Sequence, residues 1–191
     1  MVNYVYDLSG KIDVNKTIDR MTKDDRKIRE YIEDRIFDSR YKPTLDLNKL
    51  KELTPYAATL VAKYKGNGTV YLPNLDKTSW QALERLVKVK AKVLDLSGLK
   101  SLDLLKARAI GEFRGIALVF NGLESIDASV VSELTCFDGK ALFFNGVKKL
   151  TPTQARNLLR FRGKEIFLYG LRSISLEVAR LFLAWKGKIH I

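Results

Sequence analysis

A unit of about 24 residues recurs along this chain and constrains its fold more than any other feature. The apolar residue that follows each predicted strand recurs after one step of 25 residues and then four steps of 24: Leu50, Leu75, Leu99, Leu123, Val147 and Leu171. A fixed period of this length is typical of repeat proteins, in which each unit packs mainly on its neighbours. The chain is therefore predicted to be a stack of similar units.

Each unit begins with a strand pattern, two apolar residues separated by one position. The pairs are Leu45/Leu47, Val70/Leu72, Leu94/Leu96, Leu118/Phe120, Leu142/Phe144, Ile166/Leu168 and Ile189/Ile191. Residues two apart on a strand point to the same face, so each pair is expected to enter the core.

A helix pattern follows each strand. Good N-cap residues occupy one register position: Thr54, Ser79, Asp103, Asp127, Thr151 and Ser175. Apolar residues at the fourth, seventh and tenth positions after the cap predict a buried stripe on about three helical turns. The twelfth position is Gly66, Ala91, Gly115, Gly139, Gly163 and Gly187. Glycine there is typical of a left-handed residue that ends a helix.

These units predict an α/β fold, a right-handed solenoid of strand–helix repeats. Strands joined by crossover helices pair in parallel, and the crossover is almost always right-handed. Strands pack about 4.8 Å apart and helices about 8–10 Å apart, so we expect the parallel sheet on the concave side and the helices on the convex side.

Residues 1–43 do not follow the repeat and are predicted to form an N-terminal cap. Val5–Gly10 resembles a degenerate first strand, and apolar residues between Ile18 and Ile36 indicate one or two amphipathic helices, with a helix start near Thr22. A terminal unit of a solenoid needs such a cover for its apolar edge. Residues 44–191 are then six repeats plus a final strand.

The segments VLDLSGLKSL, LFFNGVKKL and IFLYGLRSI resemble the leucine-rich-repeat superfamily, in particular its short bacterial repeats of pattern L-x-L-x-G-L-x-S-L-[ST]-x-x-x-A-x-x-L. The resemblance covers residues 44–191. It implies a scaffold that binds proteins or other macromolecules, without catalytic residues. One position departs from the common pattern, because Leu or Val stands where the family places an Asn that holds the turn backbone. The glycines before this position (Gly98, Gly122, Gly146 and Gly170) are expected to satisfy the turn instead.

The sequence offers little for catalysis or metal binding. The only histidine, His190, has no assignable partner. The only cysteine, Cys136, is expected to be a semi-buried side chain rather than a nucleophile. We therefore predict no enzyme activity, no metal and no cofactor. A single cysteine, with no signal-peptide pattern or membrane-spanning run, favours a cytoplasmic protein with no membrane partner.

The solvent side of the strands is the first candidate binding surface. Residues predicted to bind a protein partner there are Val119, Phe143, Phe167, Tyr169, Tyr71, Asp46 and Asp95. The apolar members form a patch large enough to mark a contact, with the acidic members at the other end. The alternative interpretation is that the aromatic residues only pack against one another as cross-strand neighbours.

A basic ladder is the second candidate. The net charge of +12 belongs mostly to the repeats, since residues 1–43 hold 10 Lys and Arg against 9 Asp and Glu. Cations near the glycine position form the ladder: Lys65, Lys90, Lys92, Arg114, Arg162, Lys164, Lys186 and Lys188. They suit the phosphates of nucleic acid or another polyanion. The alternative interpretation is that they only offset helix dipoles.

The C-terminal end is the third candidate, because Ile189–Ile191 would leave an unpaired strand edge that favours homodimerisation. Taken together, the sequence favours a non-catalytic scaffold that binds another protein through the concave sheet. Polyanion binding and a self-associating structural role are the alternatives.

Overall fold

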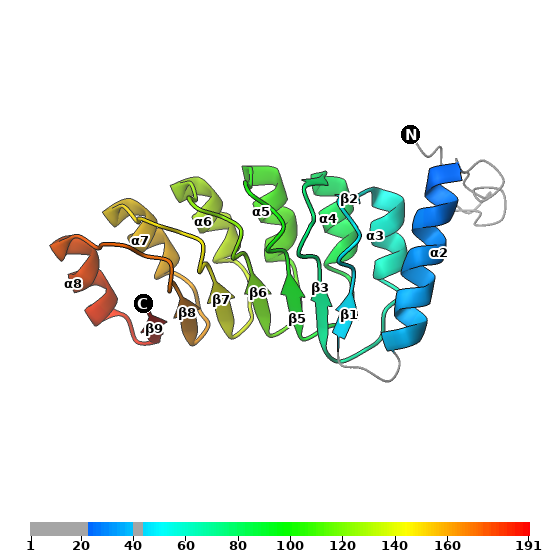
Figure 1. The fold of residues 1–191 in the computed structure, drawn as a ribbon. Coiled ribbons are helices and arrows are strands. Elements are labelled where there is room, and N and C mark those ends of the chain that lie inside the picture. Colours follow the sequence, from blue (N-terminus) through cyan, green and yellow to red (C-terminus); the bar gives the residue numbers. More distant parts are fainter. Residues whose placement is uncertain (1–22, 40–43) are drawn as a thin grey trace, which may run out of the picture.

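The computed structural model describes residues 23–39 and 44–191, and it consists of alternating strands and helices (Figure 1). The predicted strand at Val5–Gly10 and the helix start at Thr22 lie outside the described residues. The helices are α2 (Lys23–Asp38), α3 (Pro55–Val61), α4 (Trp80–Leu86), α5 (Leu104–Gly111), α6 (Ala128–Leu134), α7 (Pro152–Leu158) and α8 (Leu176–Ala184). The strands are β1 (Thr44–Asp46), β2 (Glu52–Leu53), β3 (Thr69–Tyr71), β4 (Lys77–Thr78), β5 (Val93–Asp95), β6 (Ala117–Val119), β7 (Ala141–Phe143), β8 (Glu165–Phe167) and β9 (Lys188–His190).

Seven strands form one parallel sheet in the order β1-β3-β5-β6-β7-β8-β9. Equivalent residues of consecutive repeats pair directly, for example Leu94 with Leu118 and Leu118 with Leu142. Helices α3 to α8 lie in a single row along one side of this sheet (Figure 1). The predicted α/β alternation and parallel sheet are therefore confirmed. A second parallel pair, β2 with β4, was not predicted.

The apolar residue pair of each strand and the apolar stripe of each helix fill the space between the sheet and the helix row. The residues of the first six apolar pairs are all buried, with at most 1% of any side chain exposed. The seventh pair is different, because Ile189 is only partly buried and Ile191 is 63% exposed. Phenylalanines from consecutive repeats stack within the core, as Phe120 does with Phe144 at a ring separation of 5.4 Å. The core therefore repeats along the sheet as the strands do.

All six predicted N-cap positions immediately precede a helix. Side chains at five of them accept a hydrogen bond from a backbone N–H three residues later, and Asp127 alone makes no such bond. The helices are shorter than predicted, at seven to nine residues. At 3.6 residues per turn this is about two turns. The tenth position after the cap, such as Phe113 or Phe137, therefore lies beyond the helix end, where it is still buried.

The glycines that follow the helices do not have the predicted left-handed conformation, because none of them has a positive φ. These positions require glycine because the aromatic ring two residues earlier occupies the space that a Cβ would need. A Cβ on Gly139 would lie 2.0 Å from Cζ of Phe137, and one on Gly115 would lie 2.3 Å from the Phe113 ring. The one repeat with alanine at this position, Ala91, has Val89 in place of the aromatic residue. Ring and glycine therefore occur together.

The turn after each strand depends on side chains as well as on glycine. A Cβ on Gly122 would lie 2.0 Å from the carbonyl oxygen of Ser97, so only glycine allows this close approach between repeats. Ser97 Oγ accepts a hydrogen bond from the N–H of Asn121, and Asn121 Oδ1 accepts one from the N–H of Asn145. Asn145 Oδ1 in turn accepts a hydrogen bond from the N–H of Tyr169, at a nitrogen–oxygen distance of 3.2 Å. These bonds join the turns of consecutive repeats.

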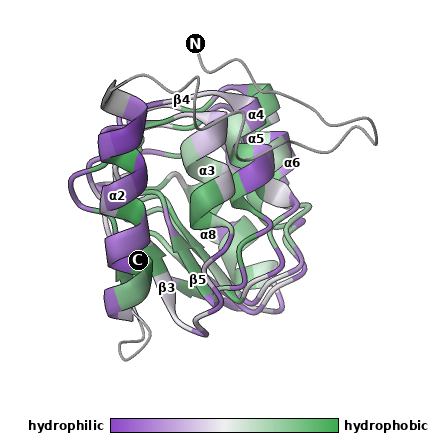
Figure 2. Cartoon of the chain, turned by 90° about the vertical axis from the view of Figure 1, so that its right-hand side faces the viewer, coloured by the Kyte–Doolittle hydropathy of each residue, from purple (hydrophilic) through white to green (hydrophobic). Residues whose placement is uncertain are grey.

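Helix α2 packs against α3 and β1 at the N-terminal end of the sheet. Ile32 is fully buried there, with Ile28, Tyr31 and Ile36 packed around it. Tyr31 Oη accepts a hydrogen bond from the backbone N–H of Lys49 at 3.1 Å. Figure 2, viewed from this end, shows a largely hydrophilic surface on α2.

The pairing of ring and glycine generates a test by double-mutant cycle. We expect Gly139→Ala to lower the free energy of unfolding by about 1–3 kcal/mol, because the added methyl group meets the Phe137 ring. Phe137→Val together with Gly139→Ala reproduces the pair Val89 and Ala91 of another repeat. In the Phe137→Val background, Gly139→Ala is therefore expected to lower the free energy of unfolding by less than half as much. Urea denaturation of the four proteins measures the coupling. Equal costs in both backgrounds would contradict the explanation.

Candidate functional site

One face of the seven-stranded sheet carries no helix in the part of the chain that the structure describes (Figure 1), and we call it the open sheet face. The last residue of each strand points to this face, opposite the buried pairs. Strand pairing aligns these residues in one row: Asp46, Tyr71, Asp95, Val119, Phe143, Phe167 and His190.

An aromatic cluster lies at the C-terminal end of this row, formed by Phe143, Phe167, His190 and Tyr169. The rings of Phe143 and Phe167 stack in parallel with centroids 4.1 Å apart, and His190 stacks on the other face of Phe167 at the same distance. Tyr169 meets the Phe167 and His190 rings edge-on, at 6.1 and 6.2 Å. The cross-strand packing proposed as the alternative interpretation is thus present. It leaves Tyr169 61% exposed and both phenylalanines partly exposed.

His190 is a member that the sequence reasoning did not select. The sequence did contain a signal for it, because Ile189 and Ile191 flank His190 as Ile166 and Leu168 flank Phe167, which puts both residues in the same row. Its Nε2 lies 3.9 Å from Oε1 of Glu165 and has no hydrogen-bond partner among the described residues. The ring therefore adds a polar group to the edge of an otherwise apolar cluster.

Small residues at the starts of the same strands lie on the open sheet face but expose little surface. Ala117 and Ala141 pair across β6 and β7 and point to the open sheet face, where each is at most 7% exposed. Val119, which was predicted as a contact residue, is 8% exposed and pairs with Phe143. Val119 therefore packs beside the cluster and presents little surface of its own.

The acidic residues lie apart from the aromatic cluster. Asp95 is two strands from Phe143, or about 10 Å at the usual strand spacing, and Asp46 is farther away. One carboxylate oxygen of each accepts a hydrogen bond from the backbone N–H two residues later, Asn48 for Asp46 and Ser97 for Asp95. Tyr71 stands between them and is 36% exposed. Both carboxylates thus stabilise turns as well as facing solvent.

The eight cations of the basic ladder are all exposed. They do not belong to the last turns of the helices, where the basic residues are Arg35, Arg85, Arg108 and Arg156. Lys65 and Lys90 each lie four residues beyond a helix end, and Arg114 lies three beyond. Because the helix dipole acts within the last turn, it does not account for these positions.

Metal-ligating side chains are dispersed over the part of the chain that the structure describes. No group of three or more His, Cys, Asp or Glu among them is placed to hold a metal ion. Cys136 is exposed rather than semi-buried, since α6 ends at Leu134 and the residue lies in the turn beyond it. The sulfur lies 3.9 Å from the carbonyl oxygen of Ser132.

The C-terminal end exposes apolar side chains. Leu176 and Leu183 of α8 are 69% and 87% exposed, and β9 is an edge strand with one neighbour among the described strands. Self-association through this end stays a prediction. No helix within residues 23–39 or 44–191 has the length and apolar character needed to cross a membrane.

No protein-family model matches this chain, and no curated protein matches its sequence. The likeness to leucine-rich repeats therefore rests on the repeat pattern and on the strand–helix architecture.

Truncating a residue of the core and one of the aromatic cluster should lower the free energy of unfolding by different amounts. We expect Phe144→Ala, in the core, to lower the free energy of unfolding by about 3–5 kcal/mol, because it leaves a cavity. Phe167→Ala is expected to cost about 1–2 kcal/mol, because it removes two stacking contacts from a partly solvated site. Urea denaturation of both variants measures the difference. A cost for Phe167→Ala as large as that for Phe144→Ala would assign the cluster to the core.

Proposed function

We propose that this chain is a non-catalytic scaffold of the leucine-rich-repeat type, and that it binds a protein partner through its open sheet face. The proposal includes the finer architecture predicted from the sequence, a right-handed solenoid with a concave sheet and with α2 as its N-terminal cap. Close spacing of strands and wide spacing of helices favour that curvature.

The aromatic cluster is the observation that carries the proposal. Stacked phenylalanines with an edge-on tyrosine form a rigid, partly dry surface, and aromatic residues of this kind dominate binding energy at interfaces. A structural role alone would be served by aliphatic residues buried on both sides. Tyr169 instead keeps its hydroxyl end in solvent while its ring packs on Phe167.

The partner is expected to insert an apolar side chain beside Phe143, Phe167 and Tyr169. Asp46, Tyr71 and Asp95 would select polar groups along the same row. The turn uses only Oδ1 of Asp95, whereas both carboxylate oxygens of Asp46 already accept hydrogen bonds from Asn48. The net charge of +12 favours an acidic partner and speeds its approach. A concave face positions all these residues toward one bound segment.

The test compares two matched pairs of truncations. Phe143→Ala with Phe167→Ala removes the cluster, and Trp80→Ala with Leu105→Ala removes two exposed apolar residues from the helix side. Proteins retained by the wild-type chain from a lysate of its source cells are identified, purified and titrated by calorimetry. We expect the first pair to weaken binding more than tenfold, as for residues that dominate an interface, and the second less than threefold.

Folding of each variant is checked by circular dichroism before titration. Equal affinity for wild type and the Phe143→Ala, Phe167→Ala variant would contradict the proposed site. A larger loss in the Trp80→Ala, Leu105→Ala variant would move the contact to the helix side.

A further inference from the structure

A string of basic hollows follows the edge of the sheet where the helices end and the strands begin, and we call it the basic groove. The first hollow, of about 550 Å³, is lined by Lys65, Lys88, Lys90 and Arg114 among others. The second, of about 510 Å³, includes Arg114, Arg160 and Arg162. The third, of about 730 Å³, includes Arg162, Lys164, Lys186 and Lys188. Arg114 and Arg162 each line two hollows, so the three adjoin.

Positive charge dominates the lining of the groove. The cations are Lys65, Lys88, Lys90, Arg114, Arg160, Arg162, Lys164, Lys186 and Lys188, and the acidic residues are Asp138 and Glu165. Every ladder residue except Lys92 is included. Arg114 pairs with Glu112 at 3.5 Å, and no other cation of the groove forms a salt bridge within the described residues. Nine exposed cations against two acids leave a strong uncompensated field.

The helix dipole does not explain the positions of these cations, because they lie beyond the last turns of the helices. Their spacing follows the sheet, because each repeat places its cations close to the start of its strand. From β3 to β9 the groove therefore extends about 24 Å at the usual strand spacing, with a break at β7, whose repeat contributes Asp138 and no cation to the lining. Such a row matches a linear polyanion.

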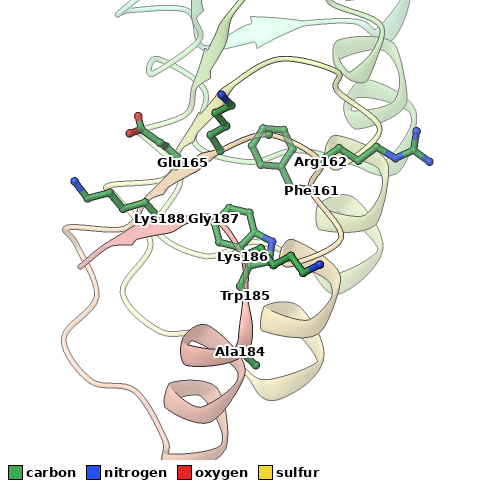
Figure 3. Close-up of a pocket in the computed structure, with 10 residues that line it drawn as sticks. Phe161, Arg162, Glu165, Ala184, Trp185, Lys186, Gly187 and Lys188 are labelled. Carbon is green, nitrogen blue, oxygen red and sulfur yellow. The ribbon is translucent and has the colours of Figure 1, made fainter.

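The third hollow adds aromatic rings to the cations. Figure 3 shows Phe161 and Trp185 within it, with Arg162, Lys186 and Lys188 around them. Phe161 is buried, whereas Trp185 is only partly buried and packs on the end of the core. The ladder predicted from the sequence contained only cations, and the structure adds these two rings to them. A partly exposed indole beside three cations is the pairing on which a nucleobase stacks while its phosphates meet the charges.

We infer that the basic groove binds single-stranded nucleic acid, with phosphates along the cations and a base on Trp185. A duplex reaches the cations but keeps its bases enclosed, so it gains less from the indole ring. Inorganic polyphosphate offers the charges without a base. The lining of the groove shares no residue with the aromatic cluster, although Glu165 of the third hollow lies 3.9 Å from His190 of the cluster. The inference therefore does not rest on the proposed protein partner.

The test is fluorescence anisotropy of the full-length chain with a labelled 20-nucleotide oligothymidine across 50–200 mM salt. We expect micromolar binding at low salt, with a slope of log K against log salt near −3, as for about four phosphates contacted on a single strand. Arg162→Glu with Lys186→Glu is expected to weaken binding at least tenfold and to flatten the slope. Lys100→Glu with Lys149→Glu changes the net charge equally at exposed sites outside the groove and is expected to weaken binding less than threefold.

Further variants separate stacking from charge. Trp185→Ala is expected to weaken binding about tenfold, and Trp185→Phe, which keeps a ring and guards against loss of folding, less than threefold. The Phe143→Ala, Phe167→Ala variant is expected to bind as the wild type does. Equal loss in the two charge-reversal variants would overturn the inference. So would equal affinity for oligothymidine, duplex and polyphosphate, or no binding at 50 mM salt.

Discussion

The close contact between consecutive repeats at the turn after each strand is the constraint on which the rest of the structure depends. At Gly122 and Gly146 the backbone of one repeat approaches the carbonyl oxygens of the previous one so closely that a Cβ would lie within 2.3 Å of them. Side chains of Ser97, Asn121 and Asn145 then accept hydrogen bonds from the next repeat. These contacts fix a direct register between neighbouring strands, and a slip of one residue would turn every apolar pair out of the core.

The register has a functional consequence, because it gathers equivalent residues into rows. On the open sheet face, the row places Phe143, Phe167 and His190 in contact although each pair is more than twenty residues apart in sequence. At the edge, the same register aligns cations from successive repeats into the basic groove. Two surfaces of different chemistry thus arise from one repeating unit, one apolar and flanked by carboxylates, the other cationic.

The strands and helices could be predicted from the sequence because each repeat carries the same strand and helix pattern. Six N-caps, the buried strand pairs and the parallel sheet follow from local chemistry that a fixed period makes visible. The predictions failed where the reason was contact rather than propensity. Position 139 requires glycine because the Phe137 ring fills the space of a side chain. Asn121 accepts a hydrogen bond from the backbone of the next repeat. Neither contact can be predicted from residue propensities alone. The row of open-face residues was predictable, whereas stacking of His190 and the Trp185 hollow depended on side-chain positions.

The most direct test of the register is a crosslink between first strand residues, of which Thr44 is exposed and Thr69 and Val93 are partly exposed. In a Cys136→Ser background, Thr44→Cys with Thr69→Cys places thiols on directly paired residues, whereas Thr44→Cys with Val93→Cys places them two strands apart, about 10 Å at the usual strand spacing. Dibromobimane fluoresces when it bridges two nearby thiols. The account predicts a fluorescent monomeric adduct in the first protein and little in the second. Equal fluorescence in both, or none in the first, would contradict the register and the surfaces built on it.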